Sequence, residues 1–217
     1  MDRTTNNPSS TRGTQTKDKI LDVALDLFSK KGYKATTVRD IAGEIGIKQS
    51  ALYNHFKNKD EILETLISDL TSSAIANIFT ENATKIAQKS PKSLLMAIAT
   101  TFKLLSFDGK NEALYRLLMQ EMFRNEKVRV IYNEYFYQEN VKKLSGILFN
   151  MMQEEKIIAS DPLLLAHEFF SPLFFYQMQV ILLKIDEKST SSVVSMFEKH
   201  VNWFWDNIKI EYQETLF

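Results

Sequence analysis

Glycine and proline are scarce, and this constrains the fold more than any other feature of the sequence. The 217 residues contain only 6 Gly and 4 Pro, and long stretches run without either residue. Because a many-stranded β fold needs frequent turns, this scarcity favours helices. Apolar residues make up 44% of the chain, which is enough for a substantial core and argues against disorder. We therefore expect an all-α protein, with room for a small domain joined to a medium one.

The spacing of apolar residues divides the chain into successive helices. In the first part they are expected at about 16–31, 37–44 and 48–54, and from residue 59 towards Phe79. Further helices are expected at about 90–107, 111–124, 128–155, 162–183 and 191–210. Thr37 and Asn58 are placed to cap the second and fourth helices, and Gly32 and Gly46 to end the first two. Residues 1–15 are polar and are expected to form a flexible tail, in which Arg3 and Arg12 either reach a DNA groove or are idle.

Charge is unevenly distributed along a chain whose formal net charge is zero. Residues 1–60 carry a net charge of +4, whereas residues 61–217 carry −4. A basic front on an acidic body is the asymmetry expected when one end of a protein meets phosphate. Nucleic acid is therefore a candidate partner, although the formal net charge of the whole chain is zero.

The stretch from Val38 to Phe56 has the spacing of a helix-turn-helix, in which two helices cross through a short turn. Ala42 supplies the small residue between the helices, and Gly46 supplies a residue that tolerates positive φ in the turn. Four branched apolar residues are spaced to clamp both helices from behind: Ile41, Ile45, Ile47 and Leu52. The remaining polar residues then point outward, on a short helix whose N-terminus can enter the major groove: Lys48, Gln49, Ser50, Tyr53 and Asn54. The alternative is an ordinary helical hairpin with a solvated face.

The same region resembles the TetR family of bacterial regulators over about residues 16–63. The matching residues are Ile20, Ala24, Phe28, Gly32, Tyr33, Thr36, Thr37, Val38, Ile41, Ala42, Gly46, Ile47, Ala51, Leu52, Tyr53, His55, Phe56, Lys59 and Asp60. The resemblance implies a three-helix helix-turn-helix domain at 16–62, followed by a larger helical ligand-sensing and dimerisation domain at 63–217. It also implies a sequence-specific transcription regulator, a ligand-released repressor acting as a homodimer on a palindromic operator in double-stranded DNA.

Roles for particular residues follow from the resemblance. Positions matching contacts to the DNA backbone are Thr36, Tyr53, His55 and Lys59, and positions facing base edges are Gln49, Ser50, Ala51 and Asn54. Thr37, Arg39 and Lys48 complete the expected DNA-binding set. Ser and Lys are frequent in the family where this sequence has Lys48 and Gln49, so the operator sequence stays open. His55, which precedes an aromatic residue, can alternatively pack against the helix behind it.

A pocket for a small apolar or amphipathic effector inside the helical domain is also implied by the resemblance. Aromatic residues and Met can line such a site, and polar residues inside apolar runs can orient a ligand. The candidates are Phe102, Tyr115, Met119, Glu121, Met122, His167, Glu168, Phe174, Gln177 and Met178. Core packing is the alternative for each aromatic residue and Met. No cofactor is expected, and the three His lack metal-ligand spacing, so no metal site is expected.

The last two helices are the expected dimer interface. The helix at 162–183 is apolar nearly all round, and the last helix carries an apolar stripe: Val193, Val194, Phe197, Val201, Phe204, Trp205 and Ile208. Two helices from each subunit would form a four-helix bundle, and a purely intramolecular core is the alternative. Polar residues interrupt 162–183, so a buried helix is expected and not a membrane span. With no Cys in the chain, we expect a cytoplasmic protein.

Two other classes of function remain as alternatives. An enzyme is disfavoured because the sequence has no glycine-rich phosphate loop, no HExxH and no nucleophile elbow. The second class is a helical protein–protein adaptor that uses its hairpin without DNA. Salt dependence separates an adaptor from a DNA-binding protein, because phosphate contacts make affinity fall steeply with salt.

Overall fold

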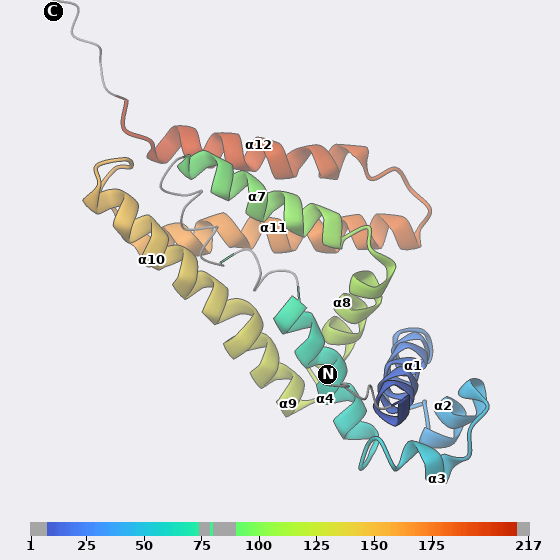
Figure 1. Ribbon diagram of the computed structural model, residues 1–217. Helices are drawn as coiled ribbons and strands as arrows, with labels where there is room; N and C mark the ends of the chain where they lie inside the picture. Colours follow the sequence, from blue (N-terminus) through green and yellow to red (C-terminus); the bar gives the residue numbers. More distant parts are fainter. Residues whose placement is uncertain (1–7, 74–78, 80–89, 212–217) are drawn as a thin grey trace, which may run out of the picture. The chain divides into compact units, whose positions relative to one another are not determined.

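The computed structural model describes residues 8–73, 79 and 90–211, shown in Figure 1. Within these residues the regular structure is helical, apart from one isolated bridge between Ile157 and Lys209. The expected all-α class is therefore confirmed. By packing, the chain divides into two compact units. The first runs to Leu70 and takes in Ala113–Val130, and the second holds Thr71–Glu112 and the chain from Ile131 onward.

The first unit is built on four helices from the start of the chain. They are α1 (Pro8–Lys31), α2 (Val38–Ile45), α3 (Gln49–Leu52) and the first turns of α4 (Lys59–Ser73). The later turns of α8 (Gly109–Glu121), followed by α9 (Glu126–Val130), belong to the same unit. From the sequence, this segment was expected in the second domain. No residue pattern within the segment indicates that it packs with the N-terminal helices.

The start of α1 corrects one expectation. The helix begins at Pro8 and not near residue 16, so residues 8–15 are not the predicted tail. Pro suits a first helical turn, and a long helix tolerates the weak helix formers Ser, Thr and Gly13 in this stretch. Residues 1–7 with Arg3, the side chain of Arg12, and residues 74–78 of the expected extension of α4 lie outside the described residues.

The helical spacing of Ile20, Ala24, Leu27 and Phe28 predicts one apolar face on α1, and this face is buried. Its side chains are all buried, together with residues from α2, α3, α4 and the segment between α3 and α4: Ile20, Ala24, Leu27, Phe28, Ile41, Ala42, Leu52, Phe56, Ile62 and Leu66. Two of the four residues expected to clamp the turn, Ile45 and Ile47, are only half-buried. Ile41 and Leu52 therefore supply most of the buried contact behind the turn.

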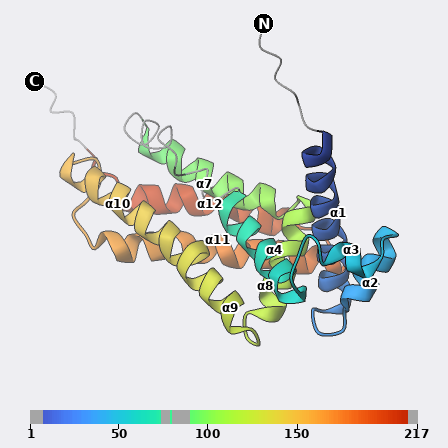
Figure 2. The same ribbon diagram turned by 60° about the horizontal axis from the view of Figure 1, so that its bottom comes forward.

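In the second unit, α11 (Pro162–Ile185) packs against three other helices. These are α7 (Pro91–Leu105), α10 (Glu139–Gln153) and α12 (Ser191–Ile208). Figures 1 and 2 show α7, α11 and α12 lying side by side, with α10 crossing α11. The shared core is mostly aromatic and branched aliphatic: Leu95, Ile98, Phe102, Leu144, Leu148, Phe169, Phe170, Leu173, Phe197, Val201 and Phe204. No helix among the described residues is long and apolar enough to cross a membrane.

The region expected as one helix at 128–155 has a different local structure. Between α9 and α10 the backbone forms a π-helix, η1 (Ile131–Gln138). π-Helical turns are rare and are frequently found at functional sites. The apolar spacing of the sequence does not distinguish such a segment from an α-helix.

Candidate nucleic-acid interface and pocket

The start of α2 is held by a capping box, as its sequence predicts. The amide of Asp40 donates to Thr37 Oγ1 at 3.1 Å, and the amide of Thr37 donates to Asp40 Oδ2 at 2.8 Å. Hydrogen bonds from the Thr37 hydroxyl and amide hold the pKa of the Asp40 carboxyl below its usual value. These contacts satisfy N–H groups that a helix start leaves unpaired, and so they fix where α2 begins.

The turn after α2 depends on Gly46, whose φ is +79°. The amide of Gly46 donates to the Gly43 carbonyl at 3.1 Å, and the next amide, that of Ile47, donates to Ala42 at 3.0 Å. These bonds close the end of α2 in the left-handed conformation that glycine adopts at low cost. The predicted role of Gly46 is confirmed, and it sets the direction in which α3 leaves the turn.

The short helix α3 presents a polar surface over a buried anchor. Leu52 is fully buried at 0% exposure, whereas the surrounding polar side chains are exposed: Lys48, Gln49, Ser50, Tyr53 and Asn54. The Gln49 amide donates to the Tyr53 hydroxyl at 3.4 Å, which orients both toward the same side. Lys48 is the N-cap and makes no side-chain cap bond, consistent with the absence of a capping residue type there. Ala51 is half-buried.

Two residues expected to contact phosphate are turned into the protein instead. Thr36 is 0% exposed, and its hydroxyl donates to the carbonyl of Gly32 at 3.0 Å. The ammonium group of Lys59 donates to the carbonyls of Tyr33 at 2.7 Å and Thr36 at 2.8 Å. Burial lowers the pKa of Lys59, although nearby acidic groups oppose this. The side chains of Thr36 and Lys59 therefore hold the chain between α1 and α2 against the start of α4.

Tyr33 completes this internal contact, and sequence reasoning gave it no role. Its ring packs edge-on against Phe28 at 5.1 Å between centroids, and the Lys59 ammonium lies 4.1 Å from its centroid. Its hydroxyl donates a short hydrogen bond to Asp60. Burial, and then this bond to Asp60, raise the pKa of Tyr33 well above its usual value. In the sequence, the pair Gly32-Tyr33 marks the end of the first helix. It does not reveal the contacts of Tyr33 with Lys59 and Asp60, because these residues are remote in sequence.

The other expected DNA-binding residues lie at the surface to different degrees. Thr37 and Arg39 at the start of α2 are exposed, and His55 is half-buried. The ring of the adjacent Phe56 is buried and has the Lys17 ammonium 5.4 Å from its centroid. Both interpretations of His55, packing and phosphate contact, remain compatible with its partial exposure.

The ten expected ligand-binding residues are divided between the two units. Four belong to the first unit: Tyr115, Met119, Glu121 and Met122. Glu121 is 4% exposed, and its charge raises the pKa of both Lys59 and Tyr33, so it lies among the contacts that hold the N-terminal helices. Tyr115 is buried as well. These two side chains therefore serve the interior of the first unit.

The remaining six lie on α7 and α11 of the second unit. Phe102 and Phe174 stack edge-on at 4.9 Å, and Phe102 is fully buried. Gln177 is 3% exposed, and its Oε1 has no hydrogen-bond partner. Met178 is half-buried, but Glu168 is exposed, which does not suit an enclosed site. His167, the sixth, lines a pocket.

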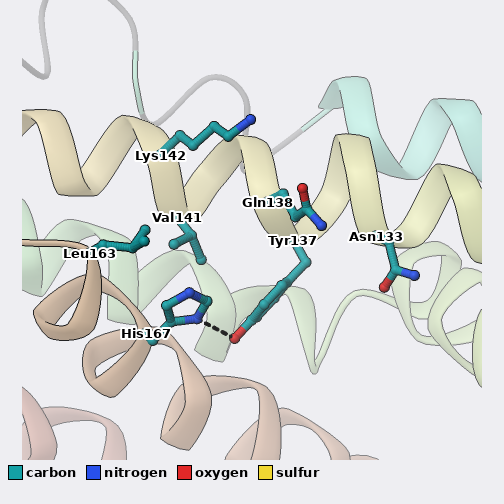
Figure 3. A pocket seen from close by; sticks show the side chains of 7 residues that line it. All are labelled: Asn133, Tyr137, Gln138, Val141, Lys142, Leu163 and His167. Carbon is teal, nitrogen blue, oxygen red and sulfur yellow. Dashed lines mark hydrogen bonds between the residues drawn. The ribbon is translucent and has the colours of Figure 1, made fainter.

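This pocket has a volume of about 440 Å³ and lies between η1, α10 and α11 (Figure 3). Its lining residues are Asn133, Tyr137, Gln138, Val141, Lys142, Leu163 and His167. Tyr137 Oη and His167 Nδ1 are 2.9 Å apart, and the Tyr137 ring also contacts Phe174 at 5.6 Å between centroids. Of the ten expected ligand-binding residues only His167 lines it, and Phe174 lies next to it through Tyr137. Among the described residues, no three His, Cys, Asp or Glu are grouped to bind a metal ion.

The last two helices expose apolar side chains, but not those that the sequence predicts for α12. Four members of the expected stripe are buried within the chain because α12 packs against α7 and α11: Phe197, Val201, Phe204 and Ile208. For these four the intramolecular alternative is correct. The exposed apolar residues are instead Leu163, Leu164, Phe175, Leu182, Ile185, Met196 and Trp203.

Comparison with known proteins finds a family whose model matches the N-terminal part of the chain. The model of the family described as bacterial regulatory proteins, tetR family, matches residues 20–66. The repressor KstR2 of Mycolicibacterium smegmatis is 45% identical over 53 residues, 24% of this chain and 26% of that protein. IcaR of Staphylococcus epidermidis, a negative transcriptional regulator of the biofilm operon icaADBC, is 54% identical over 46 residues, 21% of this chain and 25% of that protein. The aligned part thus spans about a quarter of each of these curated relatives.

Solved structures resemble the chain over most of its length. A TetR-family transcriptional regulator from Mesorhizobium loti superposes with a TM-score of 0.71 at 18% identity, covering 92% of this chain and 99% of that one. FadR of Bacillus subtilis, solved in complex with stearoyl-CoA, gives 0.69 at 22% identity, covering 87% and 97%. Residues 20–66 thus match the tetR family of bacterial regulatory proteins, and the chain shares its fold with solved regulators over most of its length.

Proposed function

We propose that this protein is a sequence-specific transcription regulator that binds an operator in double-stranded DNA. The observation that carries the proposal is the exposed polar row on α3, set on a helix that Leu52 anchors and Gly46 directs. A short helix of this kind, after a tight turn, reads base edges in the major groove. Gln49 and Asn54 have side-chain amides that can pair with adenine edges, and Ser50 and Ala51 lie between them.

Phosphate contacts in this proposal come from exposed side chains around α2 and α3: Thr37, Arg39, Lys48, Tyr53 and His55. Thr36 and Lys59 are moved from this set to a positioning role, because their polar atoms are used inside the unit. Their contribution to DNA binding is then indirect. They hold the helices whose exposed faces meet DNA.

A homodimer through α11 and α12 accounts for the apolar side chains that these helices leave exposed. Trp203 is 65% exposed and Phe175 is 53% exposed, and an interface with a second copy would remove this apolar surface from water. A two-fold dimer places two recognition helices in successive major grooves about 34 Å apart, which matches a palindromic operator.

Repression released by a small effector is the proposed direction of control. KstR2 is named a repressor and IcaR a negative regulator, and FadR was solved with stearoyl-CoA. A ligand that binds one conformation of the dimer better shifts the population towards it, and release follows if that conformation fits the operator poorly. Because its target is chromosomal DNA, we place the protein in the bacterial cytoplasm. These relatives are named as transcription regulators, which disfavours both the enzyme alternative and the adaptor alternative.

Salt titration of operator binding tests the proposal. Operator DNA is first selected from random duplexes, and affinity is then measured by fluorescence anisotropy at several salt concentrations. Lys48→Met is expected to reduce the slope of log affinity against log salt by about 1, the value for one lost phosphate contact. Lys188→Met is the control, because Lys188 is exposed, pairs with Asp186 and lies in the second unit. Selection of no sequence, with no salt-dependent binding to any DNA, would favour the adaptor instead.

A further inference from the structure

The pocket between η1, α10 and α11 has an uneven chemistry. Its apolar lining consists of Val141, which is 2% exposed, and Leu163, which is 47% exposed. The rim carries Lys142, the one charged side chain in the lining, and the lining includes no carboxylate. A site of this kind favours a ligand with negative charge at one end and hydrocarbon at the other.

Hydrogen-bond donors add to this preference. Asn133 and Gln138, both on η1, line the pocket and each carry an amide NH₂ group. The π-helical backbone of η1 therefore supplies three of the seven lining residues. A rare backbone conformation concentrated at a polar pocket is a pattern found at functional sites.

The Tyr137–His167 pair sets the polarity of the pocket floor. When the Tyr137 hydroxyl donates to Nδ1 of a neutral His167, the ring proton resides on Nε2. Figure 3 shows this second ring nitrogen on the side of Val141, within the pocket. His167 then offers a donor, and not an acceptor, to a bound molecule.

We propose that this pocket binds a small amphipathic anion, a molecule with a carboxylate head and a compact apolar body. Lys142 supplies the charge that attracts the head, His167 in the Nε2–H tautomer supplies a second donor, and the body lies against Val141 and Leu163. The volume of about 440 Å³ is within the range of small-molecule sites. This inference deepens the proposed effector response and rests on it for any consequence at DNA.

Three probes of similar size but different head group test the ligand class. Phenylacetate, 2-phenylethanol and 2-phenylethylamine are titrated into the full-length protein by isothermal titration calorimetry. Phenylacetate is expected to bind about five-fold more tightly than either of the others, because it alone carries a charge opposite to that of the exposed Lys142 ammonium group. Chemical-shift changes of the Val141 and Leu163 methyl groups locate the bound molecule.

Paired variants connect the preference to the pocket. Lys142→Met is expected to weaken phenylacetate binding by about five-fold and to leave 2-phenylethanol unchanged. Lys143→Met is the matched control, because Lys143 is the next residue, pairs with Glu139 at 3.5 Å and does not line the pocket. Leu163→Ala is expected to weaken all three probes equally, since it removes apolar contact and no charge.

Equal affinity for the three probes, binding that is insensitive to Lys142→Met, or no binding of phenylacetate at millimolar concentration would overturn the assignment. Operator affinity with and without phenylacetate is measured separately. If phenylacetate binds as expected but operator affinity does not change, the pocket assignment stands and the proposed effector response fails. If no operator is found, calorimetry still decides the ligand class.

Discussion

The ammonium group of Lys59 lies 2.8 Å from the carbonyl oxygen of Thr36, across 23 residues of chain. The same group donates to the carbonyl of Tyr33 at 2.7 Å. One lysine at the start of α4 thus satisfies two carbonyls of the turn between α1 and α2. A cation whose donors are used in this way stabilises the unit and is a poor candidate for a phosphate contact.

Lys59→Met is therefore expected to lower the free energy of unfolding by about 1 kcal/mol, because it removes charge-assisted hydrogen bonds from a half-buried site. Urea denaturation measures this loss. Without urea, where the variant is folded, the slope of log operator affinity against log salt should stay at its wild-type value. Lys57→Met, at an exposed position two residues earlier, provides the comparison, with no expected change in stability. A slope reduced by about 1 in Lys59→Met would return Lys59 to the DNA-contacting set.

Two glycines of the helix-turn-helix should respond to alanine in opposite directions. Gly46 has φ +79°, and a Cβ there meets no atom within 4 Å, so the cost of Gly46→Ala is backbone strain alone. We expect a loss of about 1–2 kcal/mol. Gly43 lies inside α2, is exposed, and a Cβ there also meets nothing within 4 Å. Gly43→Ala should gain about 0.5–1 kcal/mol from helix propensity. Thermal denaturation of both variants checks the contrast, and destabilisation by Gly43→Ala would contradict it.

Stability should fall at mildly acid pH because of His200. His200 is 7% exposed, and its Nε2 lies 2.9 Å from the carbonyl oxygen of Phe169, which it meets as a donor. Burial lowers its pKa below 6.5, while the bond to Phe169 and the charge of Glu168 oppose the shift. Below pH 6.5 the unfolded chain binds this proton more readily than the folded one. The contribution of neutral His200 to the free energy of unfolding is therefore fully present above pH 6.5. It is lost as the pH falls towards the pKa of His200 in the folded protein.

His200→Phe should make the free energy of unfolding less dependent on pH over that window, even if it changes the absolute stability. Urea denaturation of wild type and variant between pH 7 and about pH 5 gives the difference. Two parallel curves would show that other groups cause the pH dependence. The NMR titration of the His200 ring measures its pKa directly.

Dimerisation should depend on the exposed face of α12. Trp203→Glu places a charge at a side chain that is 65% exposed in one chain, so it should leave the fold intact and shift the assembly to monomers. Phe123→Glu is the control, because Phe123 is also aromatic, 80% exposed, and lies in the first unit. Sedimentation velocity distinguishes the two. A Trp203→Glu protein that stays dimeric would move the interface away from this face.

Local features of the fold could be predicted from the sequence because their causes lie within a few residues. Thr37 and Asp40 cap α2 three positions apart, and Gly46 ends it through a backbone angle that other residues adopt at a cost. The face of α1 around Ile20 and Phe28 follows from helical periodicity alone. The polar row on α3 follows in the same way, since Leu52 can be buried only if its polar neighbours turn outward.

Only the tertiary structure decided which of several suitable faces became core. The last helix has more apolar residues than one side can hold, and its packing against α7 and α11 buried Phe197 and left Trp203 exposed. Thr36 and Lys59 have side chains equally able to meet phosphate or carbonyls, and the approach of the α1–α2 turn to α4 supplied the carbonyls. The pocket beside Tyr137 and His167 likewise depends on side chains that η1, α10 and α11 bring together. Periodicity and capping act over one or two helical turns, whereas these outcomes depend on residues distant in sequence.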